Sequence, residues 1–333
     1  MRRLIPGVIL SIVIGLVSIG VAQIETRTLG HPVIEGLVVA ILLGMIVRST
    51  IELPEALDGG VNFTAKQVLE AAVFLLGASV DLPLLMRAGP SLAIGIVLLV
   101  VIGLSVSYAI GRALGLPSKL AVLVACGNSI CGNSAIAAVA PVIGADKKHV
   151  ASAIAFTAIL GVAVVLGLPL LIHPLDLSHY QYGVLAGLTV YAVPQVLAAA
   201  FPVSALSGQV GTLVKLVRVL MLGPVVLFFA LRHRGEAGVD ADRGGITRYV
   251  PWFIIGFLAL AALRSTGAIP NGLADPLKTI SGWLTVAAMA ALGLGVDLRA
   301  LRTVGRPVIL TVSASLAVLI VLAVTLIRIL HIA

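Results

Sequence analysis

Two Gly-Asn-Ser tripeptides, at 127–129 and 132–134, interrupt the apolar stretch 122–144. Unpaired polar groups in the middle of a bilayer are costly, so this pattern predicts a broken membrane helix that lines a polar cavity. Asn and Ser can cap the half-helix that restarts near Ala135, which directs its free N–H groups and positive dipole end into the gap. Such helix ends bind anions, and broken helices form substrate sites in secondary transporters. Alternatively, Gly and Ser are small residues where membrane helices pack closely, but that interpretation does not explain two Asn residues.

Two further groups of residues are candidates for the same site. In the segment 182–200, Pro194 frees a backbone carbonyl, and Gln195 either fills that gap or faces a ligand. Lys215 and Arg218 are three residues apart, so they lie on one face of a later helix. Ionisable groups inside a membrane are functional candidates by default, although these two could instead extend their charges to the membrane surface. If they face the cavity, the substrate is an anion.

We therefore expect a site in which polar side chains and backbone N–H groups hold a small anion. Asn and Ser side chains of the broken stretch would bind the anion, Gln195 would complete the cradle, and Lys215 or Arg218 would set its charge selectivity. The candidate residues are Gly127, Asn128, Ser129, Cys131, Gly132, Asn133, Ser134, Tyr191, Gln195, Lys215 and Arg218. The half-helix that starts near Ser134 would supply the backbone donors.

Other residues that could carry chemistry have simpler interpretations. Cys126 and Cys131 are the only cysteines, with no histidine nearby in the sequence, so they are interpreted as packing residues rather than metal ligands. Asp81 and Asp297 each follow an apolar segment and precede a short amphipathic run, so we expect helix N-caps rather than ion ligands. The six histidines stand near the ends of apolar segments or between them. No cofactor is expected.

The composition requires these residues to be positioned by membrane helices. The 333 residues are 60% hydrophobic and only 11% charged, and the mean hydropathy is +1.17, whereas soluble domains are about 25% charged. The net charge of +8 is spread between apolar runs, which favours topology signals over a nucleic-acid surface. Runs near the length that spans a bilayer predict an all-α protein with eleven transmembrane helices. The predicted spans are 4–23, 32–50, 66–81, 90–113, 118–144 (broken), 148–172, 182–200, 212–231, 249–266, 281–297 and 306–330.

The distribution of basic residues predicts the orientation of these spans. The first run follows Arg2 and Arg3 and resembles a signal peptide, but its length favours a first transmembrane helix. With the N-terminus in the cytoplasm, thirteen of the 22 lysines and arginines fall on the cytoplasmic side. Lys147 and Lys148 fall on the opposite side and weaken this bias. No stretch is polar enough and long enough to form a separate domain, so residues 1–333 are expected to form one integral membrane domain.

An internal repeat relates residues 34–110 to residues 250–326 at a constant offset. Arg-Ser-Thr at 48–50 recurs at 264–266, and Gly-x-x-Val-Asp-Leu at 77–82 recurs at 293–298. The copies begin at the second and ninth predicted spans, seven crossings apart, and an odd number inverts one copy relative to the other. Inverted repeats are the architecture of alternating access.

The motifs resemble those of the YeiH-type family of bacterial inner-membrane proteins, which carries the label of sulfate exporters. The resemblance covers nearly the whole chain and rests on Ser-Ile-Cys-Gly-Asn-Ser at 129–134, Val-Pro-Gln-Val at 193–196 and the Lys-x-x-Arg pair at 215 and 218. It implies a secondary transporter. A more distant similarity to bile acid/sodium symporters and sodium/proton antiporters implies a scaffold and a core with broken helices, an elevator-like architecture. Some members place His-Glu where this chain has Tyr191 and Ala192, so proton coupling through that Glu is not carried over.

These observations predict a transporter that moves a small anion, such as sulfate, sulfite, a related sulfur oxyanion or a sulfonate, across the bacterial inner membrane by alternating access. The chain lacks phosphate-loop, zinc-protease and nucleophile-elbow motifs, so we do not expect an enzyme. One alternative is a sodium- or proton-coupled symporter of organic anions, and another is an anion channel. The expected partners are the anion, the lipid bilayer and a second copy in a homodimer, with Na+ or H+ as the candidate coupling ion and no nucleic acid.

Overall fold

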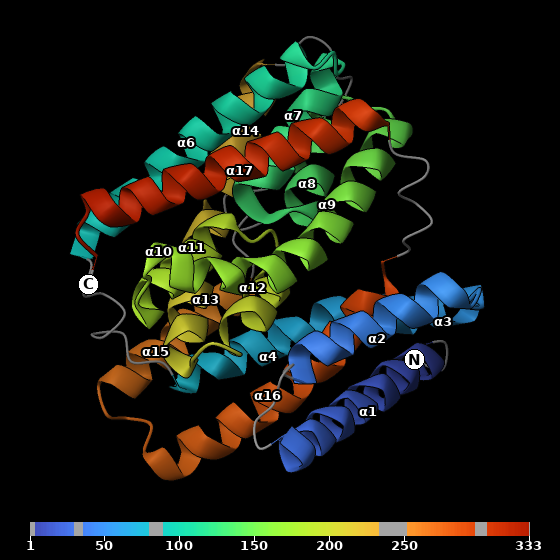
Figure 1. The fold of residues 1–333 in the computed structure, drawn as a ribbon, viewed down its shortest axis with the longest axis vertical. Helices are drawn as coiled ribbons and strands as arrows, with labels where there is room; N and C mark the ends of the chain where they lie inside the picture. Colours follow the sequence, from blue (N-terminus) through green and yellow to red (C-terminus); the bar gives the residue numbers. More distant parts are fainter. Residues whose placement is uncertain (1–3, 30–35, 80–88, 233–251, 297–304, 333) are drawn as a thin grey trace. The chain divides into compact units, whose positions relative to one another are not determined.

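The structure, a computed structural model, describes residues 4–29, 36–79, 89–232, 252–296 and 305–332. All regular elements within these ranges are helices (Figure 1), which confirms the predicted all-helical fold class. Asp81 and Asp297, predicted to cap short helices, lie outside the described residues, as do residues 233–251.

Six helices among the described residues are long and apolar enough to cross a membrane. They are Ile5–Ile24, Gly89–Ala113, Lys147–Leu175, Ala205–Arg232, Gly272–Leu294 and Arg306–Ile329. Four shorter apolar helices accompany them, at Gly36–Thr50, Ser118–Cys131, Asn133–Val142 and Trp252–Ser265. The multi-pass character is confirmed, whereas the predicted number of eleven spans is not.

The chain divides into two compact units, and unit 1 comprises residues 1–85 and 252–299. Its elements are α1 (Ile5–Leu29), α2 (Gly36–Thr50), α3 (Glu55–Phe63), the π-helix η1 (Thr64–Val68), α4 (Leu69–Leu76), the 3-10 turn η2 (Gly77–Ser79), α15 (Trp252–Ser265) and α16 (Asn271–Leu294). Helix α2 packs along α16, and α15 packs along α4.

Reciprocal glycine contacts join the two predicted repeat copies within unit 1. A Cβ atom added to Gly77 would overlap the carbonyl of Phe257, and one added to Gly293 would overlap the carbonyl of Ile41. Gly77 and Gly293 are equivalent positions in the repeat, and so are Ile41 and Phe257. Two copies that exchange the same contact in both directions are related by a two-fold axis. These contacts support an internal repeat, and its inversion stays a prediction from the number of crossings.

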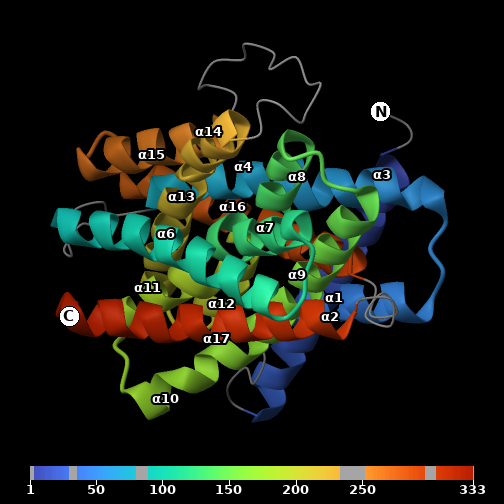
Figure 2. The ribbon, with the colours of Figure 1, turned by 90° about the horizontal axis from the view of Figure 1, so that it is seen from above.

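Unit 2 comprises residues 86–251 and 300–333 and holds every predicted site residue. Its elements are α6 (Gly89–Ala113), α7 (Ser118–Cys126), the π-helix η4 (Gly127–Cys131), α8 (Asn133–Val142), α9 (Lys147–Gly167), the 3-10 helix η5 (Leu168–Leu171), α10 (Ile172–Leu175), α11 (His179–Thr189), α12 (Val193–Ala200), α13 (Ala205–Leu220), α14 (Leu222–Arg232) and α17 (Arg306–Ile329). Helices α6 and α17 run side by side, and α13 packs along α11 (Figures 1 and 2).

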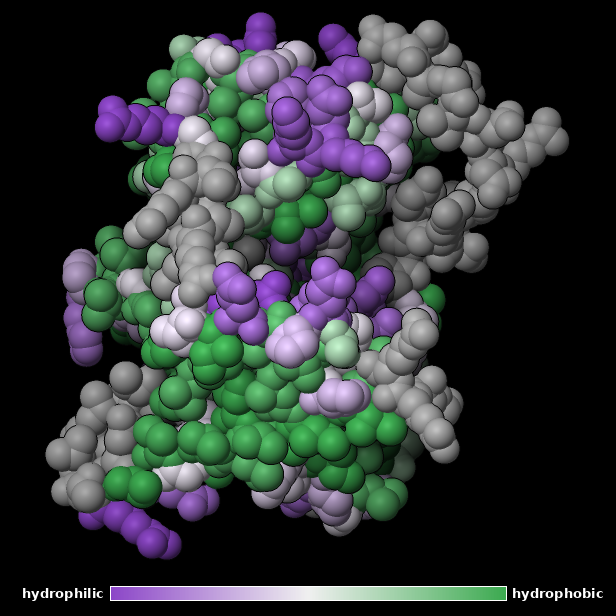
Figure 3. All heavy atoms as spheres, turned by 90° about the vertical axis from the view of Figure 1, so that its right-hand side faces the viewer, coloured by the Kyte–Doolittle hydropathy of each residue, from purple (hydrophilic) through white to green (hydrophobic). Residues whose placement is uncertain are grey.

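The outer faces of the long helices are apolar. More than half of the surface is exposed for three apolar side chains of α6, Ile94, Leu98 and Val101. The same holds for Leu310 and Val321 on α17. Figure 3 shows broad hydrophobic areas on one face of the molecule, with hydrophilic side chains gathered into patches. Exposed apolar faces of this extent fit a lipid environment rather than water.

Candidate functional site

The broken stretch of the sequence forms a helical hairpin rather than a spanning helix. At its base, Lys119 Nζ donates to the carbonyl of Gly144 at 3.0 Å, so the segment begins and ends at the same place. Nearer the tip, a Cβ built on Gly127 would lie 2.9 Å from Ile136 Cδ1, although a straight helix would separate these residues by about 13 Å. The prediction that 118–144 crosses the membrane is therefore wrong. We define residues 118–142 as the first hairpin.

Gly132 makes the turn at the tip of the first hairpin. Its φ of 63° and ψ of −126° lie in a region that residues with a Cβ rarely adopt. The first arm, α7 with η4, ends at Cys131, and the second arm, α8, begins at Asn133. Both the C-terminal end of the first arm and the N-terminal end of the second arm therefore lie at the tip.

Residues 179–200 form a second hairpin. Tyr182, near the start of α11, donates its hydroxyl hydrogen to the carbonyl of Ala199, near the end of α12, at 2.9 Å. A straight helix would separate these residues by about 25 Å, so the predicted seventh span is also wrong as a crossing. The chain turns through an extended segment between Thr189 and Val193. Pro194 does not kink a helix, because it stands in the first turn of α12, where no N–H is needed.

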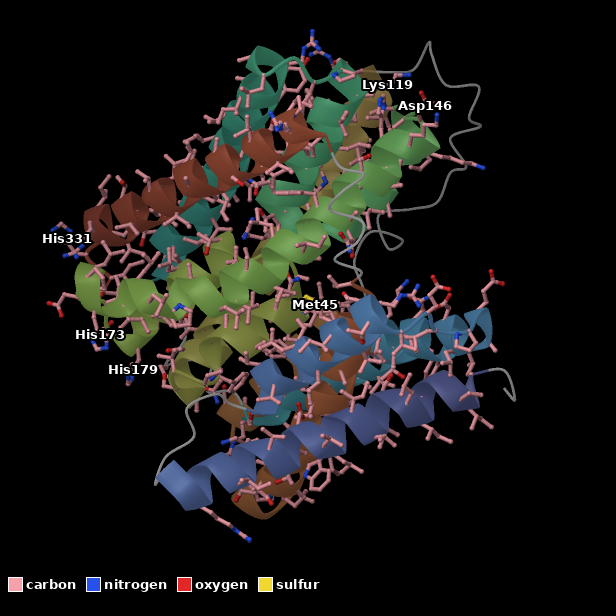
Figure 4. The ribbon with its side chains drawn as sticks, turned by 45° about the vertical axis from the view of Figure 1, so that its right-hand side comes forward. Met45, Lys119, Asp146, His173, His179 and His331 are labelled. Atoms are coloured by element: carbon pink, nitrogen blue, oxygen red, sulfur yellow. The ribbon has the colours of Figure 1, made fainter. Side chains whose placement is uncertain are left out.

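The two hairpins enter unit 2 from opposite ends and meet at their tips. Figure 4 shows Lys119 and Asp146, at the base of the first hairpin, at one end of the unit, and His179, at the base of the second, at the other. At the tips, a Cβ built on Gly132 would lie 3.3 Å from Tyr191 Cβ. The two breaks that the sequence predicted separately are thus in contact.

Lys215 and Arg218 on α13 lie between the tips and bind the carbonyl ends of both first arms. Lys215 Nζ donates to Ile130 O of the first hairpin at 2.6 Å and to Val190 O of the second at 2.8 Å. Both cationic side chains are fully buried. They therefore neither reach the membrane surface nor face an open cavity.

The guanidinium of Arg218 also donates hydrogen bonds to carbonyls of both hairpins, through three nitrogen atoms. Its Nε donates to Ser129 O at 3.2 Å and its Nη2 to Asn128 O at 3.1 Å. On the other hairpin, Nη1 donates to Gly187 O at 3.0 Å. The last turn of a helix leaves carbonyls without intrahelical partners and carries the negative end of the helix dipole. The two buried cations satisfy both needs.

The charges around the tips leave an excess of positive charge. Each tip holds one helix C-terminus and one helix N-terminus, whose partial charges of about half a unit and opposite sign cancel. Lys215 and Arg218 remain, and no carboxylate is among the buried side chains of the described residues. The ionisable side chains buried at the tips are therefore all basic among the described residues.

The second arms begin with donors that point to another surface, along α9. Asn133 Oδ1 accepts the hydroxyl hydrogen of Thr157 at 2.7 Å, while Asn133 and Ser134 are exposed. Gln195 Oε1 accepts the Ala192 N–H at 3.2 Å, which caps α12. The Gln195 amide lies against Gly161, whose missing side chain makes room for it. Because Thr157 and Gly161 are one turn apart on α9, the two amides lie near each other.

Asn128 and Ser129 face away from this surface, toward α6 and α17. Asn128 Nδ2 donates to Ser107 Oγ at 3.2 Å, and Ser129 Oγ lies 3.1 Å from a Cβ built on Gly103. The buried atoms Asn128 Oδ1, Ser129 Oγ and Ser315 Oγ have no hydrogen-bond partner among the described residues. The residues of the predicted cradle thus lie on two different surfaces. Asn133, Ser134 and Gln195 lie together on the surface along α9, whereas Asn128 and Ser129 face α6.

The remaining predicted residues support the tips. Cys126 and Cys131 are buried free thiols, and Tyr191 is buried at the contact with Gly132 with an unpartnered hydroxyl among the described residues. Thr157 and Gly161 were not predicted as site residues. Their signal in the sequence is a pair of small residues four apart in an apolar helix, which is common in membrane proteins.

The chain is similar to known proteins along most of its length. A protein-family model described as conserved hypothetical protein 698 matches residues 6–312. A UPF0324 membrane protein of Bradyrhizobium diazoefficiens is 53% identical over 98% of this chain and 93% of its own length. One of Brucella suis is 53% identical over 100% of this chain and 98% of its own length, and one of Bacillus cereus is 36% identical over 81% and 79%. The chain therefore belongs to the UPF0324 family of multi-pass membrane proteins.

Proposed function

We propose that the protein is a secondary transporter that moves a small anion across the bacterial inner membrane by alternating access. The observation that carries this proposal is the meeting of two helical hairpins at buried tips whose only buried charges, among the described residues, are cations. Hairpin tips that present helix N-termini inside a membrane protein are suited to binding small anions. Sulfate, sulfite, related sulfur oxyanions and sulfonates are the substrates expected from the family resemblance.

The division of the chain supports an elevator-like mechanism. All the predicted site residues belong to unit 2, which would be the moving core, and unit 1 would be the scaffold. The reciprocal contacts of Gly77 and Gly293 support an internal repeat, and two equivalent states of a carrier follow when its copies are inverted, as the odd number of crossings predicts. If neither hairpin crosses the membrane, five crossings instead of seven separate the two repeat copies. Five is still an odd number, so the copies are still expected to be inverted relative to each other.

The first hairpin also strengthens the proposed orientation. If residues 118–142 do not cross, Lys147 and Lys148 lie on the same side as Lys119 and join the cytoplasmic group. The two residues that weakened the positive-inside bias then reinforce it. Cysteines introduced by Ser118→Cys and Lys148→Cys should react with an impermeant reagent from the same, cytoplasmic side. Reaction from opposite sides would contradict both the hairpin and the orientation.

Counterflow in proteoliposomes tests the proposed function. Vesicles loaded with unlabelled sulfate should accumulate labelled sulfate transiently when the protein is present, because a carrier exchanges its substrate and a channel only conducts it. The Asn133→Ala, Ser134→Ala double variant should be folded and inactive. Unchanged exchange by this variant would place the site elsewhere, and flux with no counterflow would favour the channel.

Ion coupling separates the remaining transport alternative. The described part of the core has no buried carboxylate that could bind Na+ or H+. We therefore expect net sulfate flux to survive an ionophore that dissipates the sodium and proton gradients. Loss of transport under that treatment, with carboxylates as substrates, would favour the symporter of organic anions.

A further inference from the structure

The carbonyl ends of the two first arms present the ligands of a cation site. Ile130 O and Val190 O belong to different hairpins and converge on one nitrogen atom, Lys215 Nζ, at 2.6 Å and 2.8 Å. Ile130 lies in the last turn of the first hairpin's first arm, and Val190 caps the end of α11. In membrane transporters, such half-helix C-terminal ends and unwound carbonyls coordinate the coupling Na+ or H+. Here a side chain of the protein itself takes the place of the ion.

The Lys215 ammonium is stabilised by these carbonyls rather than by an acidic partner. Its two hydrogen bonds are short, as is usual for an ionised donor. The side chain is fully buried, and no carboxylate is among the buried side chains of the described residues. The negative ends of two helix dipoles therefore face the ammonium group. Arg218 bonds further carbonyls of the same arms, Ser129 O and Gly187 O, so the tips hold two monovalent cations.

The covalent attachment of Lys215 distinguishes it from a coupling ion. A coupling ion binds and leaves in each transport cycle, so the affinity for the substrate follows the concentration of the ion. Lys215 is part of α13 and cannot leave for the solvent. The two tips are therefore bridged without an ion from solution, and an ion gradient has no free carbonyl site to act through at this place.

We propose that Lys215 is a built-in substitute for a coupling cation, so that the carrier moves its anion without a monovalent cation from solution at the first arms. The inference rests on the proposed function and deepens it, because it names the source of the charge that bridges the tips. It also predicts a latent site. When the lysine side chain is removed, a monovalent cation should bind between Ile130 O and Val190 O, and the total charge at the tips would be unchanged.

The Lys215→Ala variant of the full-length protein, combined with n-propylammonium, tests this inference. The substitution removes Cγ, Cδ, Cε and Nζ, and these are the heavy atoms of n-propylammonium. The unfolding midpoint of the variant should rise with n-propylammonium concentration, as expected for a ligand that binds only the folded state. Choline has the same charge but no N–H donor, so it should have no such effect at equal ionic strength. Sulfate counterflow by the variant should be about tenfold faster in n-propylammonium than in choline.

Two further variants and the wild-type protein serve as controls. Lys215→Met fills the space of the lysine without a charge, so it should be less stable than the wild type and insensitive to n-propylammonium. Lys119 Nζ also donates to a carbonyl, that of Gly144, but at an exposed contact, so Lys119→Ala should be insensitive as well. The wild-type protein should have the same unfolding midpoint in Na+, K+, n-propylammonium and choline.

Three outcomes would overturn the role of Lys215. They are saturable stabilisation of the wild-type protein by Na+ over choline, a Lys215→Met variant as stable as the wild type, and a Lys215→Ala variant that no cation stabilises or allows to be purified. Each of them leaves sulfate counterflow by the wild-type protein, and so the proposed function, standing. Absence of that counterflow would instead overturn the proposed function, and this inference with it.

Discussion

The two arms of each hairpin end at the same tip but present opposite chemistry. The first arms end in carbonyl oxygens, which Lys215 and Arg218 occupy from inside the protein. The second arms begin with N–H donors for which the described residues provide no comparable partners. The carbonyl side is thus complete without a ligand, and the donor side is not. The comparison indicates that Lys215 and Arg218 hold the two tips together, and in the proposed function contact with the anion would fall to the second arms.

Removal of Arg218 tests the completed side and should have the largest effect. Arg218→Met leaves the buried carbonyls of Asn128, Ser129 and Gly187 without these donors, which should destabilise the protein by about 3 kcal/mol or more. Thermal unfolding in detergent measures this loss. Arg328→Met is the control, because Arg328 is at an exposed contact with Leu175 O, and it should cost about 1 kcal/mol or less. Equal stability of Arg218→Met and wild type would mean that the carbonyls have other donors.

Isosteric carboxylates test the open side. Asn133→Asp and Gln195→Glu keep the oxygens bonded to Thr157 and to the Ala192 N–H, but replace each outward NH2 group by a charged acceptor. We expect a loss of anion affinity of about a hundredfold, since a charge-assisted hydrogen bond is lost and repulsion is added. Asn133→Asp is at an exposed position and should keep its stability, whereas Gln195→Glu buries a carboxylate and should also destabilise the protein. Sulfate titration gives the affinity.

Asn62→Asp and Gln67→Glu provide the same changes of charge at exposed positions of unit 1. They should bind sulfate as the wild type does. If they weaken binding as much as the site variants, overall charge rather than the donor side controls affinity.

The turn of the first hairpin is a smaller but more local test of how the tips meet. Gly132→Ala adds a Cβ at a φ of 63° and against Tyr191, which should cost about 2 kcal/mol. Gly115→Ala meets no atom within 4 Å at a φ of 84°, so it should cost only about 1 kcal/mol from the backbone. The difference in unfolding midpoint between the two variants reports the contact of the tips together with the backbone conformation of Gly132. No difference would argue that the tips do not touch.

The smallest effect is expected among the buried polar side chains of α6, η4 and α17, which are Ser107, Asn128, Ser129 and Ser315. Ser315→Ala removes a hydroxyl without a partner among the described residues, so stability should change by less than about 0.5 kcal/mol. Ser107→Ala removes the partner of Asn128 Nδ2 and should cost about 1 kcal/mol. A larger loss from Ser315→Ala than from Ser107→Ala would show that the Ser315 hydroxyl is bonded.

The sequence predicted where the helices break but not which way the chain continues. The Gly-Asn-Ser repeat correctly indicated a break, and the turn falls at Gly132. Residues 118–144 have the length of a span, so hydropathy alone cannot distinguish a straight broken helix from a hairpin. The misplaced charges of Lys147 and Lys148 were the available signal. They conflict with a crossing and agree with a hairpin.

The roles of individual side chains depend on contacts between residues that are far apart in the sequence. Lys215 and Arg218 were predicted as candidate site residues, but their partners are carbonyls 25 to 90 residues away, which spacing along one helix cannot reveal. Thr157 resembled any small residue of an apolar helix until the structure brought it to Asn133. The positions of the helices were predictable from the local sequence pattern. Which helix ends are bonded by Lys215 and Arg218, and which are not, was not predictable.

A crystal structure with selenate, a tetrahedral analogue of sulfate whose selenium is located by anomalous scattering, tests the central claim most directly. The account predicts selenium beside the Asn133 and Gln195 NH2 groups at the start of α8 and α12, with Lys215 and Arg218 still bonded to the carbonyls of the first arms. Selenium bound directly by Lys215 or Arg218, with those carbonyl bonds broken, would contradict it.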